Sequence, residues 1–259
     1  MSHYFVAVIS KKNEKGVISA LLEPYKESKK IEYRDCTEEV LNVWNTGKSE
    51  YGTEINHDEY ENSIEKFADE YFGYETYKED GYVKYGYWYN PNAKWDWYSI
   101  GGRWNNFLKL KRSVESDKTC SDIVNLSKPE CTNVAQIKDI DFSLNKEDYN
   151  SSIRFWELYI EDQEPKNKEE KELKVCTLYK KEFYINRYKT KENYAKSVSS
   201  FSTFAVVTEE GWFEQGQMGW FGLSNETDDE AIAWVDNYYD RFIKNADPEL
   251  YIKIVDCHI

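Results

Sequence analysis

A group of aromatic and charged residues near the middle of the chain combines side chains that recognise planar and anionic ligands. It lies in the stretch NPNAKWDWYSIGGRWNNF. Trp95 and Trp97 can stack on a flat ring, whereas Lys94 and Arg103 can hold an anion. Asp96 is an acidic group with which Arg103 could pair. We therefore predict a ligand-binding site formed by Lys94, Trp95, Asp96, Trp97 and Arg103.

The same stretch also has a purely structural interpretation. Trp95 and Trp97 are two residues apart, so in a strand they share one face and could fill a core while the charges point outward. Gly101 and Gly102 either let a ligand approach the backbone or turn the chain where a Cβ would clash. No phosphate-loop spacing accompanies them. The sequence leaves both interpretations of the tryptophans open.

A second aromatic stretch, GWFEQGQMGWFG, interleaves four glycines with large rings. Trp212 and Trp220 would form the walls of a tight loop, and Glu214 is its ionisable group. We include both tryptophans among the candidate ligand-binding residues. The alternative is a packed turn without a ligand.

The third candidate is the run Asp256-Cys257-His258, whose side chains include nucleophile and acid–base types. In a strand, Asp256 and His258 share a face and Cys257 points away, so the three cannot act as a simple triad. If the first and last strands pair, His3 would lie near Asp256 and His258 in an acid–base or metal cluster. The alternative is histidines that are only hydrogen-bonded. Beyond these three residues we assign no catalytic group, and we expect no metal and no cofactor.

Apolar patterning predicts the elements that position these residues. HYFVAVI, residues 3–9, and LYIKIVDCHI, residues 250–259, indicate two buried strands that neighbour each other in one sheet. Residues 201–208 indicate a further strand, and Thr227 with Glu230 forms a capping box that starts a helix over 227–245. We therefore predict an α+β fold, with a mixed or antiparallel sheet, helices packed on it, and the terminal strands in the same sheet.

The remaining pattern is read as part of the same domain. Residues 60–72 have helical spacing, with Gly73 as the stop, and residues 82–89 indicate a strand. The run EDQEPKNKEEKE, residues 161–172, is expected to be an exposed charged loop. We predict a single α+β domain over residues 1–259.

Charge and composition restrict the partners. The chain carries 48 Asp and Glu against 34 Lys and Arg, a formal net charge of -14, which disfavours binding to duplex nucleic acid. Such a surface suits docking on a basic partner, or it serves solubility alone. No apolar run approaches the ~20 residues of a membrane span, and the first ten residues do not resemble a signal peptide. With five widely spaced cysteines and no CxxC pair, we expect a protein of the cytoplasm.

Several sequence blocks occur together in one known group of proteins. These are MSHYFVAVI, LLEPYKE, NPNAKWDWYSIGGRW, KDIDF, TFAVVTEEGWFEQGQMGWFG (which ends in MGWFG) and VDCHI. The chain resembles a family of uncharacterised phage and prophage proteins. The blocks cover roughly a third of the chain. The resemblance implies a phage or mobile-element origin and one integrated fold, and it supplies no established activity.

Two functions follow as hypotheses. The first is a non-enzymatic phage accessory protein that inhibits a host anti-phage defence system, in the manner of an anti-CRISPR inhibitor, by binding one of its protein components in the host cytoplasm. The second is a nucleotide-binding protein, either a sponge or a phosphodiesterase-like enzyme that acts on a defence signal. In the second hypothesis Trp95, Trp97 and Arg103 hold base and phosphate, and Asp256 and His258 are the catalytic candidates.

Overall fold

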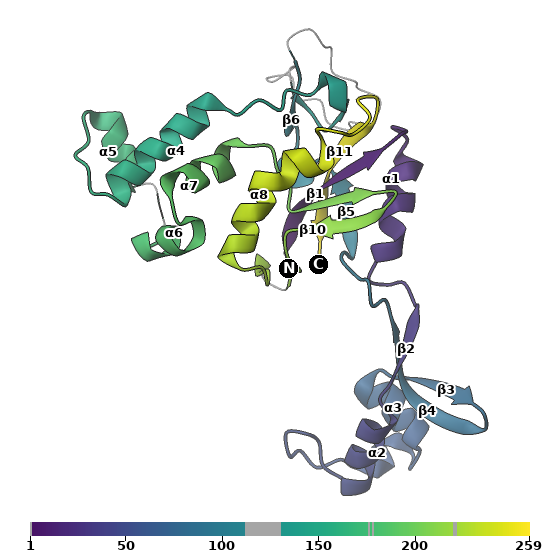
Figure 1. Cartoon of the computed structure of the whole chain (residues 1–259). Helices are drawn as coiled ribbons and strands as arrows, with labels where there is room; N and C mark the ends of the chain where they lie inside the picture. Colours follow the sequence, from purple (N-terminus) through teal and green to yellow (C-terminus); the bar gives the residue numbers. More distant parts are fainter. Residues whose placement is uncertain (1, 112–130, 176, 178, 220–221) are drawn as a thin grey trace. The chain divides into compact units, whose positions relative to one another are not determined.

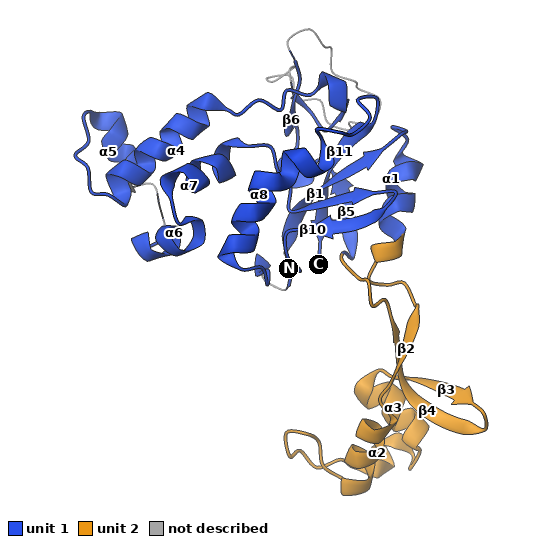
Figure 2. Ribbon diagram, in the orientation of Figure 1, with its two compact units in different colours: residues 1–23, 95–259 blue, residues 24–94 orange. Residues whose placement is uncertain are grey.

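The structure, a computed structural model, describes residues 2–111, 131–175, 177, 179–219 and 222–259. They form two compact units, which Figure 2 distinguishes by colour. We call residues 1–23 with 95–259 the main unit and residues 24–94 the inserted unit. The expectation of a single domain over residues 1–259 did not foresee this division, because the second unit has a sheet, helices and a core of its own.

The main unit is built on a mixed sheet with the strand order β10-β9-β1-β11-β5, in which β8 also pairs with β11. Its strands are β1 (His3–Ser10), β5 (Trp97–Ile100), β8 (Val134–Gln136), β9 (Ala205–Thr208), β10 (Gly211–Glu214) and β11 (Tyr251–His258). β1 is antiparallel to β11 along all eight residues and parallel to β9. The predicted α+β class, with the terminal strands in one sheet, is confirmed (Figure 1).

Helices cover both faces of this sheet. α8 (Asp228–Phe242) begins with the predicted capping box and packs its Tyr238 into the core cluster with Ala7 and Ile254. The opposite face receives α1 (Lys15–Leu22), where the Ser19 hydroxyl lies 2.7 Å from the Tyr98 hydroxyl. Successive strand residues point to opposite faces, so the two helices together bury both sides of β1. Side chains at alternate positions of β1 lie on the same face of the sheet, so His3 lies on the face that α8 covers.

Four helices between β8 and β9 pack around an aromatic cluster that is separate from the sheet core. They are α4 (Lys146–Tyr159), α5 (Lys168–Val175), α6 (Lys181–Tyr188) and α7 (Lys191–Ser199). The expected loop over 161–172 is partly wrong, because α5 starts inside it. Arg154 binds Glu170 at 2.8 Å and lowers the pKa of that carboxyl to about 2, which ties the charged run to α4.

Shorter elements complete the main unit. They are β6 (Leu108–Lys109), β7 (Cys131–Thr132), and the 3-10 turns η3 (Gly102–Trp104) and η4 (Ile137–Asp139). The turn η1 (Glu23–Tyr25) lies where the main unit passes into the inserted unit. No helix among the described residues is long and apolar enough to cross a membrane.

The inserted unit packs two helices on a three-stranded antiparallel sheet with the order β2-β4-β3. Its elements are β2 (Glu32–Asp35), α2 (Thr37–Thr46), η2 (His57–Tyr60), α3 (Ile64–Phe72), β3 (Glu75–Glu79) and β4 (Tyr82–Tyr89). Val40, Phe67 and Tyr85 form the centre of its core. The predicted stop at Gly73 is confirmed: this residue caps α3 with a φ of +72°.

Candidate acid–base site

The sheet register brings both terminal histidines and one tryptophan into a row. His3 in β1 lies opposite His258 in β11, which lies opposite Trp97 in β5. Asp256 is two residues before His258, so its side chain lies on the same face. Asp96 and Asp256 complete this group. We call the five residues the acid–base site: His3, Asp96, Trp97, Asp256 and His258.

Each histidine is oriented by its own carboxylate. Nδ1 of His3 lies 2.9 Å from Oδ1 of Asp256, and Nδ1 of His258 lies 2.6 Å from Oδ1 of Asp96. A carboxylate accepts a hydrogen bond, so each Nδ1 carries hydrogen and each Nε2 is left as the atom that can exchange a proton. Neither Nε2 is bonded to a described residue. The ring centroids are 5.0 Å apart, in an edge-to-face arrangement.

Asp256 is the most buried residue of the site, with only 2% of its surface exposed. Its Oδ2 accepts a hydrogen bond of 3.0 Å from the backbone N–H of Arg103. A Cβ on Gly102 would lie 2.3 Å from the same oxygen, and the φ of Gly102 is +51°. Of the two roles considered for the glycine pair, the structure therefore favours a turn at a position where a Cβ would clash. The turn fixes the carboxylate that orients His3.

Trp97 is the exposed wall of the site. Its indole stacks on the His258 ring, with centroids 5.1 Å apart and an interplanar angle of 19°, and meets the edge of His3 at 5.4 Å. Trp97 remains 45% exposed, and the Asp96 side chain 38%. The indole and the Asp96 carboxylate are therefore accessible to solvent, whereas both imidazoles are mostly buried.

The two neighbouring tryptophans do not share a face, and that expectation is wrong. β5 begins only at Trp97, so strand alternation does not extend back to Trp95. Trp95 is 5% exposed and donates its Nε1–H to the carbonyl oxygen of Leu22 at 2.9 Å. Trp95 therefore belongs to the core of the main unit, whereas Trp97 belongs to the acid–base site.

The structure does not add the other predicted ligand-binding residues to the acid–base site. Lys94 is the last residue of the inserted unit. Trp212 donates its Nε1–H to Glu214 at 2.8 Å and lies near Tyr4, on the opposite face of β1 from His3. Trp220 lies outside the described residues.

Arg103 differs from expectation in its partner. Asp96, the proposed acidic partner, is instead bonded to His258. The Arg103 side chain is exposed and forms no ion pair with any residue that the structure describes. Its guanidinium therefore has no partner among the described residues, whereas its backbone N–H is bonded to Asp256.

Cys257 is unsuited to act as a nucleophile. It is fully buried on the face opposite the two histidines, and burial raises the pKa of its thiol. The reactive thiolate is thus disfavoured. Cys257 faces away from the two histidines, as the strand alternation predicted. Among the residues with described positions, no group of three or more His, Cys, Asp or Glu could hold a metal ion.

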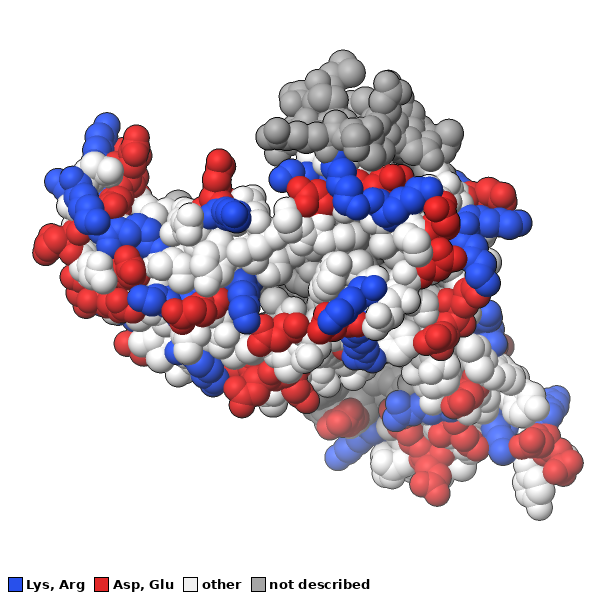
Figure 3. Space-filling view, turned by 45° about the horizontal axis from the view of Figure 1, so that its top comes forward, with Lys and Arg blue, Asp and Glu red and all other residues white. Residues whose placement is uncertain are grey.

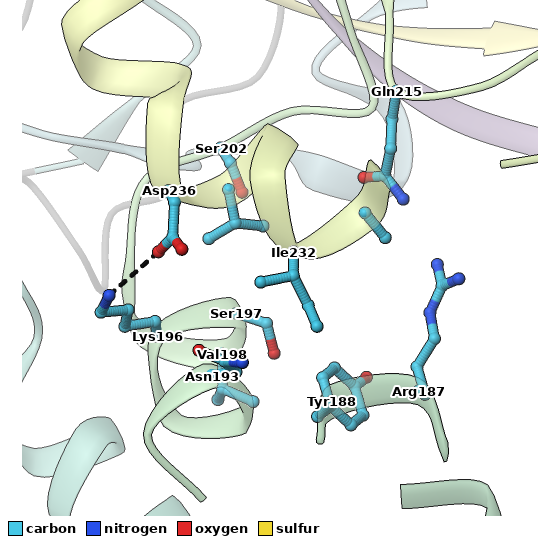
Figure 4. A pocket seen from close by; sticks show the side chains of 12 residues that line it. Arg187, Tyr188, Asn193, Lys196, Ser197, Val198, Ser202, Gln215, Ile232 and Asp236 are labelled. Atoms are coloured by element: carbon cyan, nitrogen blue, oxygen red, sulfur yellow. Dashed lines mark hydrogen bonds and ion pairs between the residues drawn. The ribbon is translucent and has the colours of Figure 1, made fainter. Parts of the chain in front are cut away.

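A separate cavity of about 240 Å³ lies between α6, α7 and α8 (Figure 4). The charges around it are paired within the chain: Lys196 binds Asp236 at 2.9 Å, and Arg187 binds Glu226 at 2.6 Å. No sequence pattern indicated this cavity, because its lining comes from segments that are separate in the chain and meet only in the folded protein. Every charged side chain among the described residues that line the cavity is paired, so the acid–base site remains the stronger candidate.

No protein-family profile, no curated protein and no solved structure matches the chain.

Proposed function

We propose that the protein is a phosphodiesterase that cleaves a nucleotide by acid–base catalysis with His3 and His258. One observation carries the proposal: two imidazoles, each oriented through Nδ1 by a carboxylate, lie edge to face with centroids 5.0 Å apart. Imidazole is the side chain whose ordinary pKa lies nearest to neutral pH, so a pair of them can supply a base and an acid together.

The reaction needs two proton transfers. One neutral imidazole takes a proton at Nε2 from the attacking water or substrate hydroxyl, whose oxygen forms the new bond to phosphorus. The bond from phosphorus to the leaving oxygen breaks, and the second, protonated imidazole gives that oxygen its proton. The two histidines end in exchanged protonation states, and solvent restores them. Asp96 and Asp256 stabilise whichever imidazole is protonated.

Two further residues support a nucleotide as the substrate. The exposed indole of Trp97 offers a stacking surface for a base. The exposed guanidinium of Arg103 can bind a phosphate oxygen, since no described residue pairs with it. We place this activity in the host cell cytoplasm and infer that its substrate is a signal nucleotide of an anti-phage defence system, as the resemblance to phage and prophage proteins suggests.

The test is turnover of defined nucleotides. The purified protein is incubated with cyclic oligonucleotides and adenine dinucleotides, with and without EDTA, and the products are separated by chromatography. His3→Asn and His258→Asn should each lower the rate by about 10² to 10⁴ fold, because each removes one proton transfer. His57→Asn is the matched control, since His57 lies in the inserted unit and contacts the Trp44 carbonyl oxygen.

Two results would contradict the proposal. One is an absence of turnover with every nucleotide tested. The other is a His258→Asn variant that is as active as the unmodified protein. Depletion of a nucleotide without products would support a sponge instead.

A second candidate function is inhibition of a host defence protein by binding it. The net charge of -14 and the many exposed rings favour it. On the face shown in Figure 3, basic side chains are interspersed with acidic ones, an arrangement suited to a protein partner more than to a phosphate backbone. Expression of the protein in a host with a known defence system, scored by phage plating, tests this candidate. Unchanged plating together with no retained protein in a pull-down would contradict it.

A further inference from the structure

The sheet of the inserted unit has two unlike faces. Val83 and Tyr85 of β4 point to the face that packs on α2 and α3. Trp88 is an odd number of residues from both, so it points to the other face. Tyr33 lies directly opposite Trp88, and Tyr77 joins them from β3. We call Tyr33, Tyr77 and Trp88 the aromatic face.

The three rings form one continuous surface. Tyr33 is 5.1 Å from Tyr77 and 5.5 Å from Trp88, and Tyr77 is 5.9 Å from Trp88, measured between centroids. Each is half-buried, and none belongs to the core cluster of the inserted unit. Gly86 provides the room, because a Cβ there would lie 3.0 Å from the Tyr33 ring.

Charge around the aromatic face is acidic. Residues 24–94 contain 16 Asp and Glu against 9 Lys and Arg, a net charge of -7. The nearby cations are already neutralised: Lys84 pairs with Glu79 at 2.7 Å and with Asp35 at 3.7 Å, and Lys30 pairs with Glu75. A ligand on this face therefore meets aromatic rings beside three carboxylates and two lysines, in a unit whose net charge is -7.

Two kinds of ligand use such a surface. Single-stranded nucleic acids stack their bases on exposed rings, and proline-rich segments lay their rings between aromatic side chains. Here the charge decides between them. An acidic surface repels a phosphate backbone and attracts Lys and Arg. A proline-rich segment is also preformed as an extended helix, so binding it costs little conformational entropy.

We propose that the aromatic face binds a proline-rich segment, flanked by Lys or Arg, of a protein partner. The inference is independent of the acid–base site. It extends the second candidate function by naming the chemistry of a partner, and direct peptide binding tests it whether or not that partner belongs to a defence system.

The test measures fluorescence anisotropy of a labelled peptide of consecutive prolines, with two arginines at each end, titrated with the full-length protein. We expect saturable binding that weakens as salt is added. Trp88→Ala and Tyr77→Ala should each weaken binding by about tenfold or more, as expected for central aromatic contacts. Tyr51→Ala is the matched control: Tyr51 is a ring of the same unit that lies outside its sheet and is 91% exposed.

Further ligands and one further variant make the outcome decisive. Replacing the prolines by alanines, or the arginines by glutamates, should abolish binding. Trp88→Phe keeps a ring and should retain part of the affinity, which separates ring contact from misfolding. Equal binding of the alanine peptide, or an unchanged Trp88→Ala variant, would overturn the inference. Tighter binding of a ten-nucleotide single-stranded RNA would also overturn it, in favour of nucleic acid.

Discussion

Replacing the two neighbouring tryptophans by alanine should have opposite consequences for stability and for activity. A wholly buried tryptophan removes about 200 Å² from water, worth about 5 kcal/mol at about 25 cal/mol per Å². Trp95 is 5% exposed and also loses its hydrogen bond to Leu22, a further ~1 kcal/mol. Trp97 is 45% exposed, so its loss should cost about half as much, ~2.5 kcal/mol. The two variants should therefore differ in the free energy of unfolding by ~3.5 kcal/mol.

Thermal melts of the two variants measure this difference directly. At about 2 to 4 °C per kcal/mol, Trp95→Ala should melt about 7 to 14 °C below Trp97→Ala. Activity should rank the other way, because loss of a base-stacking contact of about 1 to 3 kcal/mol lowers kcat/KM by about 5- to 150-fold in Trp97→Ala. Trp97→Phe should keep most of the activity. Equal melting temperatures, or a Trp97→Ala variant with unchanged kcat/KM, would refute the division between core and site.

Four other predictions follow from the same structure. Deleting residues 250–259 removes the central strand β11, so the cooperative melt of the main unit should disappear; a retained melt would contradict the strand's role. Gly102→Ala should lower both stability and activity, because the new methyl group meets the buried aspartate and the backbone is left-handed. Arg103→Ala should leave the melting temperature nearly unchanged and lower activity, whereas a large stability loss would make this residue structural. Because the bond to Arg154 lowers the pKa of Glu170, the ionised carboxylate stabilises the folded protein at pH values above the ordinary pKa of Glu. This stabilisation is lost as the pH falls through about 2. Arg154→Gln should remove this component from acid-unfolding curves.

The terminal strands were predictable because their apolar runs are buried on both faces, and pairing them placed His3 beside Asp256 and His258. The sequence could not show that Asp96 binds His258. Asp96 lies just before a strand whose start no local pattern marks, and Arg103 was the more obvious partner by charge. The burial of Trp95 likewise depends on Leu22, 73 residues away in the chain.

The inserted unit escaped sequence analysis for a different reason. The strand over residues 82–89 and the helix near residues 60–72 were recognisable by their periodicity. The two strands that complete the sheet, Glu32–Asp35 and Glu75–Glu79, are rich in charged residues and lie at its edges, where apolar alternation is not required. Without them, the strand and helix did not indicate a separate core.

Where the chain enters and leaves the inserted unit, its two segments are hydrogen-bonded to each other, once within each unit. Within it, the backbone N–H of Lys94 donates to the Tyr25 carbonyl oxygen at 2.8 Å; within the main unit, Trp95 is bonded to Leu22. Closing a flexible loop of this length costs about 2.5 kcal/mol more than closing one of about four residues. Once residues 24–94 are folded, their two ends are held together, so they connect residues 23 and 95 of the main unit as a short loop would. The folding of the main unit then no longer bears the entropic cost of closing a long loop. Mutations that unfold only the inserted unit should therefore weaken the main unit by about this amount, and a short glycine-rich linker in its place should restore it.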